Sequence, residues 1–174
     1  MQDKSNALLL GNGLNRTIND GISWAELLGH LDGSLSLDNN DQVPFPLLFE
    51  RIAARRGLRP DQRTSDAFKK LKYEVAEEIA SHLEEPADLH RLFASLPFDC
   101  FITTNYDTCF ENSFMDRELL LKNPGSTRNI LKPVINANKR PLYYAHGCVK
   151  WTNTMCLGYE HYISLITKIK KRLR

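Results

Sequence analysis

Two short polar motifs contain side chains that could bind a ligand or transfer a proton. Residues 103–107, Thr-Thr-Asn-Tyr-Asp, place Thr104, Asn105 and Asp107 after an apolar segment, where a protein without a site would usually have one capping residue. The second motif is His146 followed by a glycine, which pairs a group that titrates near neutral pH with a position that a ligand or backbone can approach closely. Each motif also has a structural explanation, because Asn105 or Asp107 could cap the next helix and a single histidine is more often structural.

A glycine-containing loop follows the first apolar segment, at residues 11–16, Gly-Asn-Gly-Leu-Asn-Arg. The side chains of Asn12, Asn15 and Arg16 supply donors suited to phosphate and ribose oxygens. The loop is incomplete as a dinucleotide fingerprint, since Arg16 replaces the third glycine and no acidic residue ends a second strand about 20 residues later. A conventional Rossmann dehydrogenase is therefore disfavoured, and both a nucleotide-binding loop and an ordinary strand-to-loop turn stay open.

These motifs need strands to position them, and short apolar runs predict where the strands lie. The expected strands are Ala7–Leu10, Phe98–Thr104, a segment around Ile130–Ile135, Leu142–Ala145 and Thr154–Leu157. Because parallel strands direct their carboxyl ends to one edge of a sheet, we expect Gly11, Asn105 and His146 to converge there.

Helical periodicity separates the predicted strands. Ser23 and Glu26 form a capping-box pattern ahead of a short helix, and spacings of three and four predict the longest helix over Asp66–Glu84. The other expected helices are Phe45–Arg56, Ala87–Ser95, Tyr106–Phe114 and Tyr159–Arg174. Strands alternating with helices predict an α/β fold, in which a Rossmann-like parallel sheet is flanked by helices.

Composition limits the classes of partner. The 174 residues carry a formal net charge of +2 and are 42% hydrophobic, which predicts one folded domain and makes nucleic acid an unlikely partner. The longest apolar run, Ala7–Leu10, is too short to cross a membrane or to serve as a secretory signal, so we expect a cytoplasmic protein. The cysteines include no C-x-x-C pair, and no metal site is expected.

The motifs taken together resemble a known family. They are Gly11-Asn12-Gly13-Leu14-Asn15, Gly21-Ile22-Ser23-Trp24 with Leu27-Leu28, Ile102–Asp107, His146-Gly147 and Gly158–Tyr162. In this order, over residues 7 to about 165, they resemble the SIR2-like (sirtuin-related) domain of bacterial NAD-consuming defence proteins.

This resemblance implies a sirtuin-type sheet that holds NAD as the substrate. Asn105 would orient the ribose hydroxyls and the attacking water, Asp107 would support it, and His146 would be the general base. The expected cofactor-binding residues are Gly11, Asn12, Gly13, Asn15, Trp24, Thr104 and Asp107. Because nicotinamide leaves as a neutral molecule, the reaction needs no carboxylic acid, and an amide and an imidazole can share the remaining tasks.

Two departures from the sirtuin pattern shape the functional expectation. The cysteine spacings cannot supply the zinc module of the protein deacylases, which favours NAD hydrolysis over deacylation. The family's sheet also continues into a Gly-x-Ser-x-x-Asp strand on the adenosine side, which this chain lacks, so we expect residues 1–174 to be one SIR2-like domain that is incomplete at its carboxyl end.

Three functions follow from the resemblance. The first is an NAD glycohydrolase that forms nicotinamide and ADP-ribose as the effector of an antiphage system, with activity that the truncation could impair. The second is a non-catalytic NAD- or ADP-ribose-binding or oligomerisation module, and the third is an NAD-dependent protein deacylase. A homo-oligomer or a linked sensor domain or subunit is the expected partner.

Overall fold

Within the residues that the structure describes, the sheet contains four strands that all run parallel, as the alternation of strands and helices predicts. A computed structural model describes residues 6–18, 22–32, 43–59, 65–83, 85–114, 119–122 and 140–170. In spatial order the strands are β1 (Ala7–Leu10), β2 (Cys100–Thr103), β4 (Arg140–Tyr144) and β3 (Leu119–Lys122). The expected α/β class with a Rossmann-like parallel sheet flanked by helices is confirmed.

The register aligns the ends of the three strands that precede the polar motifs. Leu10 pairs with Thr103, and Thr103 pairs with Tyr144. Two backbone hydrogen bonds extend this alignment by one residue, from Thr104 N to the Leu10 carbonyl (3.0 Å) and from Ala145 N to the Thr103 carbonyl (2.8 Å). The glycine loop and both polar motifs therefore begin at the same edge of the sheet.

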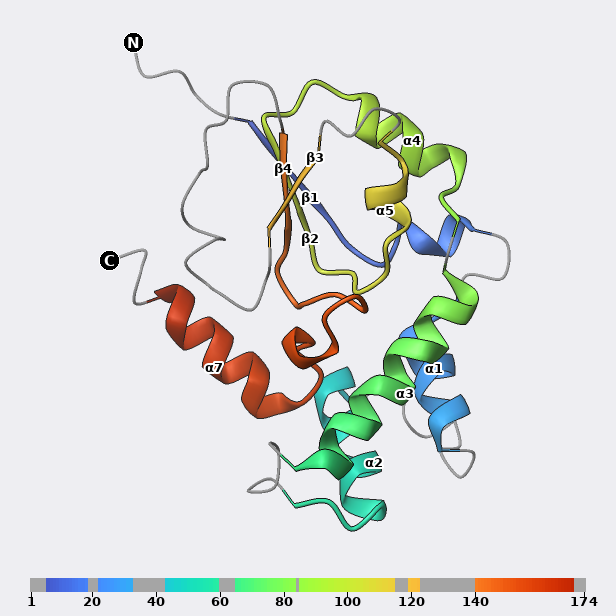
Figure 1. Ribbon diagram of the computed structural model, residues 1–174, viewed down its shortest axis with the longest axis vertical. Coiled ribbons are helices and arrows are strands. Elements are labelled where there is room, and N and C mark those ends of the chain that lie inside the picture. Colours follow the sequence, from blue (N-terminus) through green and yellow to red (C-terminus); the bar gives the residue numbers. More distant parts are fainter. Residues whose placement is uncertain are drawn as a thin grey trace.

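Three helices form a layer next to this edge, below the strand ends in Figure 1. They are α1 (Trp24–Leu31), α2 (Phe45–Arg55) and α3 (Asp66–His82), close to the predicted bounds. At the start of α1 the predicted capping box is present: Glu26 N donates to Ser23 Oγ (3.2 Å), and Ser23 N donates to Glu26 Oε2 (2.8 Å). A local sequence signal thus determines where α1 begins.

Two apolar cores hold the fold together. In the first, the predicted stripe of α3 packs against α1 and α2, through Leu27, Leu28, Phe49, Ile52, Phe68, Leu71, Val75 and Ile79 among others. The second joins the sheet to α4 (Asp88–Ser95) and α5 (Cys109–Asn112), and includes Leu10, Ala94, Phe101, Phe110, Leu142 and Tyr144. The motifs at the strand ends lie between these cores, with Tyr106 and Cys109 in the first and Leu14 in the second.

The predicted strand at Thr154–Leu157 is wrong. The segment follows a short 3-10 helix, η4 (Thr152–Thr154), and leads into α7 (Tyr159–Lys170). Its backbone groups form hydrogen bonds outside the sheet. Cys156 N donates to the His146 carbonyl (2.7 Å), and Lys72 Nζ donates to the Met155 carbonyl (2.9 Å). The apolar residues of this segment are therefore buried in a loop and not in a strand.

The helix predicted over Tyr106–Phe114 is much shorter, because α5 covers only Cys109–Asn112. The Tyr106 carbonyl accepts instead from Val149 N (2.9 Å), which holds Tyr106 in the loop before α5. Strand β3 had no counterpart among the predicted strands, and the segment predicted around Ile130–Ile135 lies outside the described residues. Within the described part of the chain, no helix is long and apolar enough to cross a membrane.

Candidate functional site

Asn105 connects the end of β2 to the glycine loop after β1. Its side-chain Nδ2 donates to the Gly11 carbonyl (3.3 Å), and its backbone N donates to Thr103 Oγ1 (3.1 Å). The preceding Thr104 Oγ1 donates weakly to the Leu10 carbonyl (3.4 Å). These contacts fix the amide of Asn105 at the edge where the two strands end.

The other half of this amide has no partner. Asn105 is 4% exposed, and its Oδ1 is buried without a hydrogen-bond partner in the part of the chain that the structure describes. A buried acceptor left in this state costs about 1–3 kcal/mol, which proteins usually avoid by pairing it. Because Nδ2 is held by Gly11, Oδ1 is the acceptor of this amide that the described part of the chain leaves unused.

Asn15 and Asp107 form a second, fully buried connection between the same two loops. Asn15 Nδ2 donates to Asp107 Oδ2 (2.5 Å) and to Asn12 Oδ1 (3.2 Å). Asp107 Oδ1 accepts from Cys109 N (3.0 Å) at the start of α5. Asp107 therefore accepts from the first residue of the short helix with one oxygen and holds the glycine loop with the other, while the N-cap position of α5 is Thr108.

His90 completes this network from a helix 75 residues away along the chain. It lies on α4, is fully buried, and contacts Asn15 Oδ1 through Nε2 (3.0 Å). Because Asp107 accepts from Asn15 Nδ2, Asn15 Oδ1 is the acceptor in this contact and His90 must carry its proton on Nε2. Burial lowers the pKa of His90, and the nearby Asp107 charge opposes this effect. His90 therefore supports the loop as a neutral donor.

His146 lies after β4, in the turn beside Thr104. Its Nδ1 is 3.4 Å from the Tyr162 hydroxyl, and the two rings pack edge to face with centroids 4.8 Å apart. Burial lowers the pKa of His146, and a hydrogen bond to the Thr104 backbone opposes this effect. The imidazole is therefore neutral near pH 7, the form that can accept a proton.

An aromatic cluster connects Trp24 to His146. Tyr106 lies between them, with its ring 5.0 Å from that of Trp24 and 6.3 Å from that of His146. The Tyr106 hydroxyl donates to the Cys156 carbonyl (2.7 Å) and lies 3.2 Å from the Tyr162 hydroxyl. Tyr106 and Tyr162 were not predicted as site residues, although both stand inside the motifs that carry the family resemblance.

The glycines of the two motifs have different reasons to be glycine. Gly147 has a φ of +91°, and a Cβ there would lie 2.4 Å from the Thr154 carbonyl oxygen, so the close approach is that of the protein's own backbone. Among the described residues, a Cβ on Gly13 would meet nothing within 4 Å, and one on Gly11 would make an ordinary 3.6 Å contact with Thr104 Oγ1. Packing within the chain therefore explains Gly147 but neither glycine of the loop.

Eight of the nine predicted site residues take part in contacts at or beside the strand ends, and the ninth, Gly13, lies in the glycine loop. Asn12, Asn15 and Asp107 form one network, Gly11, Thr104 and Asn105 form the next, His146 joins through Thr104, and Trp24 joins through Tyr106, while Gly13 lies in the loop itself. A pocket of about 330 Å³ lies elsewhere, at the end of α3. It is lined by Ala80, Leu83, Glu85, Thr108, Asn112 and Val149 and contains none of the predicted site residues.

Comparison with known proteins confirms the family resemblance. Residues 99–174 match the SIR2-like domain family, which covers β2, the Asn105 motif, β4 and His146. Over 164 residues, 94% of the chain, the sequence is 24% identical to the NAD(+) hydrolase ThsA of Acinetobacter baumannii (strain 532279). The matched region is 32% of the length of that protein, so the chain corresponds to about a third of it.

Proposed function

We propose that this SIR2-like chain binds NAD at the carboxyl edge of its sheet and hydrolyses it to nicotinamide and ADP-ribose. The observation that carries the proposal is the buried, unpaired Oδ1 of Asn105, whose amide is held in place by the Gly11 carbonyl. The similarity to an NAD(+) hydrolase supports NAD as the substrate. Donors from the loop, including the exposed Arg16, suit the diphosphate.

The proposed reaction requires one bond to break and one to form. The bond between the ribose C1′ and the nicotinamide nitrogen breaks, and nicotinamide leaves with the electron pair as a neutral molecule. A water oxygen then bonds to C1′ of the oxocarbenium-like centre, and the proton that this water loses passes to the neutral imidazole of His146. Asn105 Oδ1 would accept a hydrogen bond from a ribose hydroxyl or from the attacking water and so orient it.

The remaining predicted residues take supporting roles in this proposal. The polar atoms of Asn15 are engaged by Asn12, His90 and Asp107, so Asn15 shapes the loop from beneath. Trp24 and Tyr106 supply an aromatic wall beside His146. The antiphage role, the cytoplasmic location and a homo-oligomer or sensor partner depend on the sequence resemblance alone and stay predictions.

One observation favours the non-catalytic alternative, a module that binds NAD or ADP-ribose. The imidazole of His146 is engaged by both the Tyr162 hydroxyl and the Thr104 backbone. A histidine that acts as a base needs a ring nitrogen with a free lone pair facing the water. If neither contact is released when NAD binds, the protein will bind the nucleotide without turning it over.

Nicotinamide release and NAD binding, measured separately on purified protein, distinguish these functions. Hydrolysis predicts that Asn105→Ala and His146→Gln lower nicotinamide release at least about 100-fold, the size expected for a lost general base. Asp88→Ala, at an exposed position on α4, is the matched control and should keep full activity. Binding of NAD by calorimetry without product would support the alternative, and equal release by all three folded variants would overturn the proposed mechanism.

A further inference from the structure

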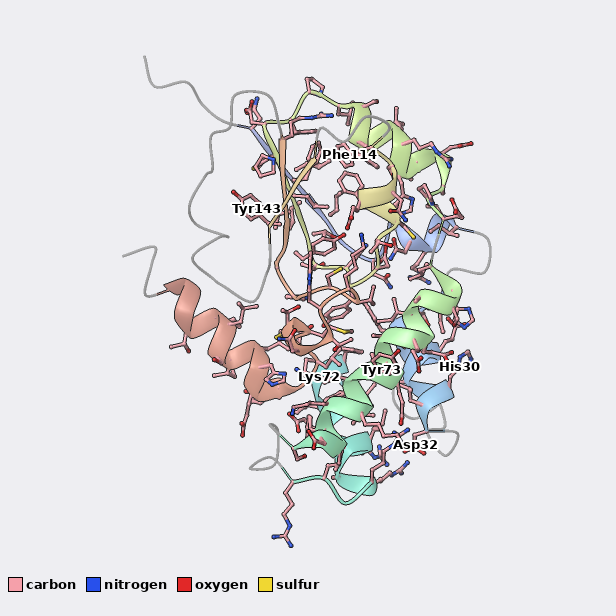
Figure 2. All side chains as sticks on the ribbon, in the orientation of Figure 1. His30, Asp32, Lys72, Tyr73, Phe114 and Tyr143 are labelled. Carbon is pink, nitrogen blue, oxygen red and sulfur yellow. The ribbon has the colours of Figure 1, made fainter. Side chains whose placement is uncertain are left out.

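Three potential metal ligands meet where α1 ends beside α3. His30 stands in the last turn of α1, and Glu78 and His82 lie four residues apart on α3, so their side chains share one face of that helix. His30 Nδ1 is 2.6 Å from Glu78 Oε1, and His82 Nε2 is 3.2 Å from the same oxygen. His30 and Glu78 are 48 residues apart in sequence, so only the fold brings them together. Figure 2 shows His30 beside α3.

The distances suit a single ion. One ligand atom from each residue lies within 4.8 Å of the other two. Zinc bonds of about 2.1 Å at tetrahedral angles place two ligand atoms about 3.4 Å apart, so a small outward rotation of His30 would complete the arrangement. The side chains of His30, Glu78 and His82 are 52%, 27% and 31% exposed, which leaves water access to a fourth coordination position.

We propose that His30 Nδ1, Glu78 Oε1 and His82 Nε2 bind a divalent transition-metal ion, with Zn²⁺ as the ion that this donor set fits best. Two imidazoles and one carboxylate are ligands that Zn²⁺ prefers, whereas Mg²⁺ and Ca²⁺ prefer oxygen ligands throughout. This site is independent of the proposed NAD site, and it would revise the sequence-based expectation that the protein holds no metal.

The competing explanation is a set of ordinary ion pairs that attach α1 to its neighbours. Arg55 binds Asp32 (2.8 Å) and Arg56 donates to the Leu31 carbonyl (2.9 Å), so the end of α1 is already held by α2. In that case the imidazoles would only donate to Glu78. The two explanations differ in the protonation state of the ring nitrogen that faces Glu78. As a metal ligand this nitrogen must offer a lone pair, whereas in an ion pair it must carry a proton.

A bound ion would link α1 directly to α3. Leu27 and Leu28 of α1 already pack in the core that α3 forms, and Trp24 at the other end of α1 contacts Tyr106. The ion would therefore act as a structural clamp. Because it binds the folded arrangement of the two helices, it should stabilise the protein by an amount that rises with the logarithm of its concentration once that concentration exceeds the Kd.

The test uses the full chain after treatment with a chelator. Zn²⁺ alone should bind in a one-to-one complex by calorimetry and should raise the melting temperature. Glu78→Gln and the double variant His30→Gln/His82→Gln should weaken binding at least about tenfold and abolish the thermal shift. Glu77→Gln is the matched control, since Glu77 is an exposed neighbour on the same helix, and it should bind as the unchanged protein does.

Co²⁺ provides a second readout that does not depend on stability. Its absorption spectrum should show bands of nitrogen and oxygen ligands and lack the charge-transfer bands of thiolates, which would report binding by the cysteines. Zn²⁺ binding of unchanged affinity in folded Glu78→Gln and in the folded double variant would overturn the proposal. So would a thiolate spectrum, or the absence of one-to-one binding by the unchanged protein.

Discussion

Asn15 donates from its side-chain amide to Asp107 across 2.5 Å, and this buried hydrogen bond joins the loop after β1 to the loop after β2. The two residues are 92 positions apart in sequence. Asp107 also accepts from Cys109 N, so a single carboxylate sets both the glycine loop and the start of α5. The position of the loop and that of the Asn105 motif are therefore coupled.

Removal of this carboxylate should destabilise the protein. Asp107→Ala leaves Asn15 Nδ2 short of its main acceptor and Cys109 N without its acceptor at the start of α5, and we expect a loss of about 2–4 kcal/mol in the free energy of unfolding. Denaturation by urea measures the loss. Asp88→Ala removes an exposed carboxylate that pairs with Arg91 and should change stability by less than about 1 kcal/mol. Equal losses in the two variants would show that the buried network contributes little.

The sequence predicted the elements whose signals are local. Short apolar runs were enough for β1, β2 and β4, and the Ser23 capping box and the apolar stripe of α3 were enough for two helices. The order of the strands then brought Gly11, Asn105 and the turn containing His146 to one edge, as the parallel arrangement requires. These predictions succeeded because neighbouring residues decide them.

The features that the sequence missed depend on distant contacts. Strand β3 consists of three leucines and a lysine, which carry no β-branched signal and become a strand only by pairing with β4. The segment at Thr154–Leu157 was mistaken for a strand, because its burial comes from loop contacts with Tyr106, Lys72 and His146. His90 and Asn15 are 75 residues apart, and the residues around each of them do not indicate that the two side chains are in contact.

The pH dependence of stability should report the neutral state of His90. Its pKa is lowered from 6.5 in the folded protein, so between that lowered pKa and 6.5 the unfolded chain binds more protons. Stability is therefore complete above about pH 6.5 and falls as the pH decreases through this window. His90→Gln keeps a donor for Asn15 Oδ1 and cannot titrate, so its urea denaturation should show a smaller pH slope than the unchanged protein. Identical slopes would mean that His90 does not carry the effect.

Two glycines that follow strands should differ in how strongly the same substitution destabilises the protein. Gly147→Ala places a methyl group against the Thr154 carbonyl at a positive φ, and we expect it to cost about 2–4 kcal/mol or to prevent folding. Gly13→Ala adds a methyl group to open space and should change stability by less than about 1 kcal/mol.

If the loop holds the diphosphate, Gly13→Ala should weaken NAD binding in calorimetry although the protein stays stable. A stable variant with unchanged NAD affinity would argue against that role for the loop.

The pH profile of nicotinamide release should follow the titration of His146. Only the neutral imidazole can accept the proton of the attacking water, and burial lowers the pKa of His146 below its ordinary value of 6.5. Activity should therefore be lost only in acid, with the midpoint of the acid limb below pH 6.5, and should stay constant through neutral pH. Tyr162→Phe removes the hydroxyl that contacts His146 Nδ1 and should shift this midpoint without abolishing turnover. A midpoint unchanged in folded Tyr162→Phe and above pH 6.5 would assign the acid limb to a group other than His146.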